Sequence, residues 1–330
     1  MLLETASWLV GRPPGSDRVV WEGDEFHRAS RRHATMNQGV IYVAFGQKYI
    51  SEVLVSAASL KRSMPDLPVT LFCDVEVACP YVDQVVRADG DDSFPGCAAK
   101  IPHIAASPYD QTLFLDSDTY VCGTLAPLFA LLDAFDLAAA HAPTRAIYEV
   151  EGVPDTFPEL NTGVILFRRS PDVQSALSRW ADLFLRYLER LRRDEIRWLR
   201  AADRRWHALN DQGVFREALY RSSVRVAILP PEYNCRFSAP GFVDGPVRIL
   251  HGRGLELSSV AAAINSISTR RGYQERFGRL ELMRHPEPSD RTYSFENIRY
   301  TLRRRGIRWT ANVAVRRLST AVRPLFWDRP

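Results

Sequence analysis

The sequence contains no long uncharged apolar run and no recognisable leader peptide. The best candidate for a membrane span, residues 125–140, includes Asp133 and Asp136, whereas a spanning helix needs roughly 18 or more consecutive apolar residues. The N-terminus has Glu4 in place of basic residues, and its apolar stretch 6–10 is too short for the core of a leader peptide. We therefore expect neither an integral membrane protein nor an exported one.

The chain also has few cysteines. Their number is odd, and no two of them form a C-x-x-C pair. A disulfide framework or a zinc cluster is therefore not expected, and reduced thiols in a cytoplasmic protein fit the pattern better. The five cysteines are Cys73, Cys79, Cys97, Cys122 and Cys235.

A net positive charge is present only in the C-terminal part of the chain. The whole chain has a net charge of +4, but residues 291–330 contain ten arginines against two acids. The first 290 residues are therefore slightly acidic, which argues against a nucleic-acid-binding body. Apolar residues recur at helical spacing in the tail, together with Trp309, Phe326 and Trp327. This pattern predicts a basic amphipathic helix that lies on an anionic membrane surface or packs against the body.

Apolar runs typical of buried strands alternate with segments of helical periodicity after residue 39. This alternation predicts an α/β fold with an open, mostly parallel mixed sheet and helices on both faces. The expected organisation is a polar lead-in over 1–38, an α/β domain over 39–255, and a helical extension over 256–330 that is basic from 291. Ligands bind at the carboxyl ends of strands in such folds, which here are the loops at Gly46, Asp74, Asp116 and His251.

Two aspartates follow the apolar strand predicted at 112–115. In extended backbone, Asp116 and Asp118 would point to the same side and Ser117 to the other. Two converging carboxylates are unfavourable unless a cation or a proton lies between them. Oxygen ligands suit Mg²⁺ or Mn²⁺, which leave positions open for substrate phosphates. A turn with two solvated acids is the alternative.

The same segment also suits a phosphohydrolase of the haloacid dehalogenase type, with Asp116 as its nucleophile. Those enzymes have Thr or Val two residues after the second aspartate, where this chain has Tyr120, with Thr119 one place early. Their motif usually opens the domain, whereas two or three predicted strands precede it here.

Further motifs occur in a fixed order around this segment. Together they resemble the GT-A nucleotide-diphospho-sugar transferases, in particular glycosyltransferase family 8 and its bacterial relatives, over about residues 39–254. The resemblance implies transfer of a sugar from a nucleotide-diphosphate sugar, expected to be a UDP-sugar, to a hydroxyl acceptor. The motifs are GVIYVAFGQKY (39–49), Lys100, LFLDSDTYV (113–121), NTGV (161–164), NDQ (210–212), PPEYN (230–234) and VRILHG (247–252).

The resemblance also implies roles for individual residues. The metal ligands would be Asp116, Asp118 and His251, and a histidine ligand favours Mn²⁺ over Mg²⁺. Arg253 stands near the place of a lysine that grips the diphosphate in the family. The positions expected to bind the donor are Ala44, Phe45, Gly46, Tyr49, Asp74, Lys100, Ser117 and Arg253. The positions expected at the donor sugar and its reacting carbon are Asn161, Asp211 and Gln212.

Asp211 also bears on stereochemistry. It begins a predicted helix, where the dipole favours the ionised form of a carboxyl and lowers its basicity. An inverting transferase needs a carboxylate that acts as a base on the acceptor. A weakly basic Asp211 suits stabilisation of positive charge at the sugar carbon better, so we expect retention of configuration.

Plainer interpretations exist for the same residues. Lys100 could be a solvated helix residue, Asn161 a turn residue, Asp211 a helix-end acid and His251 a core histidine. Two further classes of protein are a sugar-nucleotide pyrophosphorylase and a non-catalytic protein that binds membrane surfaces. A pyrophosphorylase would need a glycine-rich loop after the first strand, and residues 46–48 are too poor in glycine.

Overall fold

The computed structural model describes residues 38–90, 93–143, 150–193 and 210–284. By its internal contacts the chain divides into two compact units, 1–283 and 284–330. The described residues belong to the first unit, apart from Arg284 at the end of the last strand. Of the lead-in expected over 1–38, residues 1–37 lie outside the described residues, as does the basic tail from 291.

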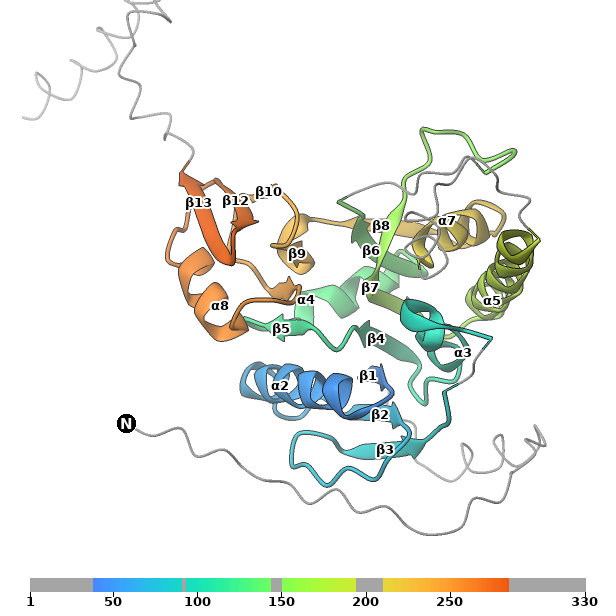
Figure 1. The fold of residues 1–330 in the computed structure, drawn as a ribbon, viewed down its shortest axis with the longest axis horizontal. Coiled ribbons are helices and arrows are strands. Elements are labelled where there is room, and N and C mark those ends of the chain that lie inside the picture. Colours follow the sequence, from blue (N-terminus) through green and yellow to red (C-terminus); the bar gives the residue numbers. More distant parts are fainter. Residues whose placement is uncertain (1–37, 91–92, 144–149, 194–209, 285–330) are drawn as a thin grey trace, which may run out of the picture. The chain divides into compact units, whose positions relative to one another are not determined.

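A seven-stranded sheet forms the centre of the described region (Figure 1), in the order β3-β2-β1-β4-β7-β6-β8. Neighbouring strands are parallel except at β7, which runs antiparallel to both β4 and β6. The predicted open, mostly parallel mixed sheet is therefore confirmed. The strands are β1 (Gln38–Ala44), β2 (Val69–Cys73), β3 (Gln84–Arg87), β4 (Gln111–Leu115), β6 (Leu137–His141), β7 (Leu160–Arg168) and β8 (Val226–Leu229).

Helices cover both faces of this sheet, as predicted. On one face, α2 (Gln47–Ser63) and α4 (Ala126–Phe129), with the 3₁₀ turn η2 (Ala130–Asp133), pack on alternate strand residues such as Val40 and Leu113. The other face is covered by η1 (Gly96–Lys100), α3 (Ile101–Ile104), α5 (Pro171–Arg192) and α7 (Gln212–Tyr220). Because both faces are buried, β1 and β4 are continuous apolar runs rather than alternating ones.

A second, smaller sheet lies beside the end of β4. It consists of β5 (Thr119–Val121), β11 (Ile249–His251) and β9 (Cys235–Arg236) in the order β5-β11-β9. In the antiparallel pair β5–β11, His251 lies opposite Thr119. This register places the end of β11 next to the turn that contains the two aspartates. The 3₁₀ turn η3 (Pro231–Tyr233) leads into β9.

The described chain ends in a third sheet, β10-β12-β13, beside α8 (Leu257–Asn265). Its strands are β10 (Gly241–Val243), β12 (Arg271–Arg276) and β13 (Arg279–Arg284). The helical prediction for 256–330 is therefore wrong over 271–284. The turn residues Phe277 and Gly278 have φ of 52° and 71°, the backbone of a tight hairpin. Within the described residues, no helix combines the length and apolar character that crossing a bilayer would take.

Candidate active site

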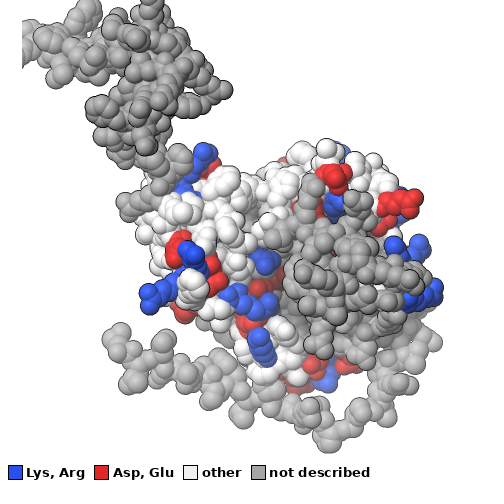
Figure 2. Space-filling view, turned by 45° about the horizontal axis from the view of Figure 1, so that its top comes forward, with Lys and Arg blue, Asp and Glu red and all other residues white. Residues whose placement is uncertain are grey.

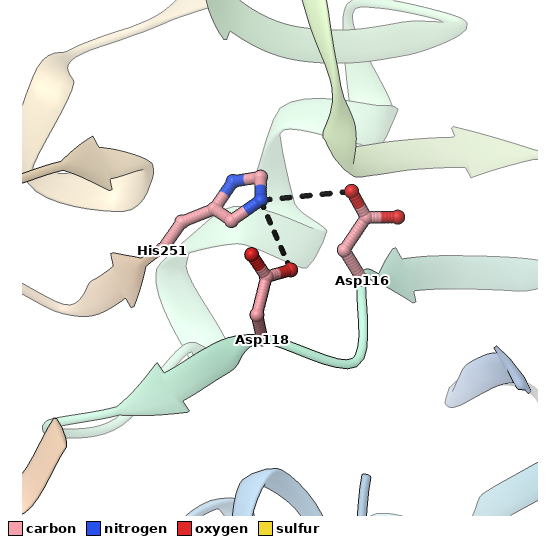
Figure 3. Close-up of side chains that lie close together, drawn as sticks. All are labelled: Asp116, Asp118 and His251. Carbon is pink, nitrogen blue, oxygen red and sulfur yellow. Dashed lines mark ion pairs between the residues drawn. The ribbon is translucent and has the colours of Figure 1, made fainter. Parts of the chain in front are cut away.

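Asp116 and Asp118 lie in the turn that links the central sheet to the small sheet (Figure 3). The N–H of Asp116 donates to the carbonyl of Gly163 at 2.8 Å, and Thr119 closes the turn through its N–H to the Asp116 carbonyl at 3.3 Å. The predicted extended backbone is therefore wrong. The two carboxylates face the same imidazole because the chain turns between two sheets.

His251 completes the cluster from the end of β11. Its Nε2 lies 3.6 Å from Asp116 Oδ2 and 3.4 Å from Asp118 Oδ1. One potential ligand atom from each residue lies within 4.8 Å of the others. His251 and Asp118 are buried, and Asp116 is partly exposed. Burial raises the pKa of Asp118, but His251 and Arg253 outweigh it and hold that pKa well below its usual range.

Gly163 provides the space for this cluster. A Cβ at this position would lie 2.0 Å from His251 Cε1 and 2.6 Å from Asp116 Oδ2. Both distances are far shorter than any van der Waals contact. The glycine in β7 is therefore required for the close approach of the imidazole to the carboxylate.

A chain of side-chain amides orients His251. Its Nδ1 lies 2.9 Å from Asn234 Oδ1, Asn234 Nδ2 donates to Asn161 Oδ1 at 2.8 Å, and Asn161 Nδ2 donates to Gln212 Oε1 at 2.6 Å. Because an amide oxygen only accepts, Nδ1 carries a proton. Nε2, which faces the two carboxylates, is therefore the nitrogen that would lose its proton when a metal binds, and the resulting tautomer is the one that a metal ligand needs.

This arrangement fits a divalent cation. Two carboxylate oxygens and an imidazole nitrogen converge here, which is unfavourable without a positive charge, carried either by a protonated ring or by a cation between the three groups. The Gly163 cradle and the fixed tautomer hold them together nonetheless. Two oxygen ligands and one imidazole suit Mn²⁺ and tolerate Mg²⁺.

Lys100 and Asp211 form a buried ion pair beside the cluster. Lys100 Nζ lies 3.1 Å from Asp116 Oδ1 and 3.5 Å from Asp211 Oδ2. Thr162 Oγ1 donates to Asp211 Oδ1 at 3.0 Å, while Asp211 Oδ2 has no hydrogen bond among the described residues. Burial tends to lower the pKa of Lys100, but Asp116 and Asp211 raise it above its ordinary value. The lysine is therefore a permanent cation.

The pKa of Asp211 differs from the prediction. Burial raises this pKa, and the attraction of Lys100 offsets only part of the rise. The expectation that a helix dipole would keep Asp211 weakly basic is therefore wrong. Its side chain does not cap α7; it faces Lys100 and Thr162 instead, so burial is the larger influence.

Arg253 lies on the other side of the aspartates. It is held by Glu52, with Nε–Oε1 at 3.0 Å and Nη2–Oε2 at 2.9 Å, by Ser117 Oγ at 3.0 Å and by Asp118 Oδ2 at 3.2 Å. Its guanidinium carbon also lies 5.4 Å from the centre of the Tyr49 ring. Glu52 was not predicted, because an acid within a helix carries no sequence signal of its partner.

The predicted loop after β1 adjoins this arginine. The N–H of Gly46, with φ of 84°, is 3.1 Å from Asp74 Oδ1, so the ends of β1 and β2 are tied together. Ala44 is buried, Phe45 lies against His103 with ring centres 5.4 Å apart, and Tyr49 is 43% exposed. The structure thus gathers the predicted donor-binding positions around one end of the sheet.

Acidic and basic side chains are interspersed over the described part of the face shown in Figure 2.

Four residues that contact or support the site were not predicted as site residues. They are Glu52, Thr162, Gly163 and Asn234. Thr162 and Gly163 lie inside the motif NTGV and Asn234 lies inside PPEYN, so membership in a motif was the only sequence signal for these three residues.

No family model and no curated protein matches the sequence, but several solved glycosyltransferases are similar in fold. An active-site mutant of LgtC has a TM-score of 0.44 and 15% identity over 64% of this chain and 86% of its own. GlyE of Streptococcus pneumoniae TIGR4 has a TM-score of 0.39 and 20% identity over 61% of this chain and 48% of its own. Mouse xyloside xylosyltransferase 1 has a TM-score of 0.40 and 14% identity over 66% of this chain and 98% of its own. The chain spans about half the length of GlyE. Because these TM-scores are below 0.5, the structural similarity is only partial. The argument for a function therefore depends on the geometry of the site.

Proposed function

We propose that the protein is a metal-dependent glycosyltransferase that uses a nucleotide-diphosphate sugar. The observation that carries this proposal is the convergence of Asp116, Asp118 and His251 at the carboxyl end of β4, between the buried Lys100 and the exposed Arg253. Lys100 and Arg253 flank the cluster at hydrogen-bonding distance from its carboxylates. Carboxylate ligands with basic neighbours suit a bound metal and a diphosphate together.

Asp116, Asp118 and His251 would hold Mn²⁺ or Mg²⁺. When bound, the cation neutralises negative charge on the leaving diphosphate, which is Lewis-acid assistance. Lys100, cationic and buried, and Arg253, fixed by Glu52, supply further positive charge for the phosphates. A fixed cation stabilises developing charge without reorganisation during the reaction.

The nucleotide would occupy the loop after β1. Ala44, Phe45, Gly46 and Tyr49 offer backbone groups and an exposed aromatic face, and Asp74 fixes the loop through Gly46. An aromatic face beside hydrogen-bonding groups suits a base and a ribose. Uridine is the nucleoside that we propose, on the resemblance described for the sequence, and Ser117 would support Arg253 at the phosphates.

The sugar would lie over Asn161, Asp211 and Gln212. Asn161 and Gln212 are hydrogen-bonded to each other at 2.6 Å, so their remaining polar groups have fixed directions. Asp211 Oδ2 lies 3.5 Å from Lys100 Nζ, which favours the ionised carboxylate, and it has no hydrogen bond among the described residues, which suits stabilisation of positive charge at the sugar carbon. Transfer to a hydroxyl acceptor is part of the proposal, with retention of configuration on the ground of the family resemblance and not of the basicity of Asp211. The cytoplasmic location expected from the cysteine pattern is also part of it.

The proposal is tested by turnover of nucleotide sugars. The full-length protein, incubated with a panel of nucleotide sugars, should release nucleoside diphosphate only with Mn²⁺ or Mg²⁺, and Asp118→Asn should abolish release while circular dichroism stays unchanged. Release of inorganic phosphate from phosphomonoesters would instead indicate a phosphohydrolase. Synthesis of a nucleotide sugar from a nucleoside triphosphate would indicate a pyrophosphorylase. Either result, or a fully active Asp118→Asn, would overturn the proposal.

A further inference from the structure

The tip of the β12–β13 hairpin carries an aromatic residue that the fold does not need. Phe277 is 90% exposed, and with φ of 52° it is the only non-glycine residue with positive φ among the described residues. A left-handed backbone favours Gly, Asn or Asp and is unfavourable for a bulky side chain. A phenylalanine here buries very little surface and adds backbone strain. Stabilisation of the fold therefore does not explain why a phenylalanine occupies this position.

Two more apolar side chains lie on the outer face of the same sheet. Phe242 is 58% exposed and Met283 is 59% exposed. Phe242 pairs with Gly272 across β10 and β12, and a Cβ at Gly272 would lie 3.2 Å from Met283 Cε. Both side chains therefore lie on one face over Gly272. The opposite face buries Tyr273 against the cluster that includes α8 residues.

Arginines accompany these apolar groups. The Arg276 guanidinium carbon lies 5.4 Å from the centre of the Phe277 ring, and that of Arg270 lies 5.8 Å from the centre of the Phe242 ring. Arg279 is exposed next to the turn. Arg270 is paired with Asp244, and the acid nearest the tip, Glu275, accepts a hydrogen bond from the N–H of Gly278.

We propose that the β12–β13 hairpin docks on an anionic lipid surface, with Phe277 entering the interface and Arg276 and Arg279 at the headgroups. Exposed apolar side chains combined with cations are what binding to an anionic membrane requires. The hairpin lies at the edge of the described region beside α8 (Figure 1). Residues 291–330, which follow it in the sequence, contain ten arginines against two acids. This charge favours a lipid surface over an apolar protein partner.

The inference does not depend on the enzymatic proposal, and sedimentation of the full-length protein with vesicles tests it. Vesicles of phosphatidylcholine with phosphatidylglycerol should bind the protein at low salt, and pure phosphatidylcholine should bind it weakly. Phe277→Asn should weaken binding by roughly tenfold, because a partly buried ring is lost. Its melting temperature should not fall, because Asn tolerates the left-handed backbone.

Two variants serve as controls. Phe277→Trp should retain binding, since an indole suits the membrane interface. Tyr81→Ala, which removes a 40% exposed aromatic ring from the loop before β3, should leave binding unchanged. Equal binding by the wild type and Phe277→Asn, or no preference of the wild type for anionic vesicles, would overturn the inference, whatever binding the tail provides.

Discussion

Replacing Gly163 by alanine should remove metal binding and leave the fold in place. The added Cβ would lie 2.0 Å from His251 Cε1 and 2.6 Å from Asp116 Oδ2. Restoring ordinary contact of about 3.5 Å requires the imidazole to move by roughly 1.5 Å. Metal–ligand distances tolerate changes of only about 0.2 Å. The shift would therefore remove His251 from the ligand set.

The expected loss of Mn²⁺ affinity exceeds the roughly 10–100-fold that removal of a supporting contact causes. Overpacking of this kind destabilises a protein by about 1–3 kcal/mol, which lowers the melting temperature by several degrees. Calorimetric titration with Mn²⁺ and thermal denaturation measure the two effects separately.

Gly245→Ala is the matched control, because a Cβ at Gly245 meets nothing within 4 Å and its φ is not in the left-handed region. It should bind Mn²⁺ like the wild type. If Gly163→Ala also bound Mn²⁺ with unchanged affinity, His251 would not be a ligand, and the account of the site would be refuted.

Three further predictions concern the surroundings of the metal site. Asn234→Ala should weaken Mn²⁺ binding by about 10–100-fold in the same titration, because His251 loses the partner that fixes its tautomer; unchanged affinity would exclude the positioning role. Asp211→Asn should slow sugar transfer strongly but leave donor affinity nearly unchanged, because charge stabilisation acts mainly in the transition state; a parallel loss of affinity would contradict that role. NMR of the first-formed product should show retention, and a β-linked product from an α-linked donor would mean inversion.

The central sheet could be predicted because its strands are buried on both faces. Continuous apolar runs such as 40–45 and 112–115 correspond to β1 and β4. The start of α5 was also predictable, since Ser170 Oγ accepts a hydrogen bond from the N–H of Val173 at 3.3 Å, as an N-cap does. Local residue types determine both features.

The small sheet could not be predicted in the same way. β5, β9 and β11 are two or three residues long, too short for a periodic pattern, and their pairing depends on contacts far apart in the sequence. Residues 271–284 were expected to be helical, because Phe277 is unusual in a left-handed backbone and Gly278 alone was a weak turn signal.

The same limit applies to the site. The proposed metal-binding residues Asp116, Asp118 and His251 were predicted from ordered motifs, but the extended backbone given as the reason for the convergence of the two aspartates was wrong. Glu52 and Arg253 are 201 positions apart and meet only in the folded chain. The raised pKa of Asp211 results mainly from burial. Burial cannot be inferred from the position of the residue at the start of a helix.

The most direct test of the central claim is the binding of UDP to the wild type and to Asp118→Asn, titrated with and without Mn²⁺. The account predicts that Mn²⁺ strengthens UDP binding to the wild type by at least about tenfold and has no effect on the variant, because Asp118 would be one of the residues that hold the cation, which would neutralise the charge of the diphosphate. Equal enhancement by Mn²⁺ in the two proteins, with both folded by circular dichroism, would contradict it.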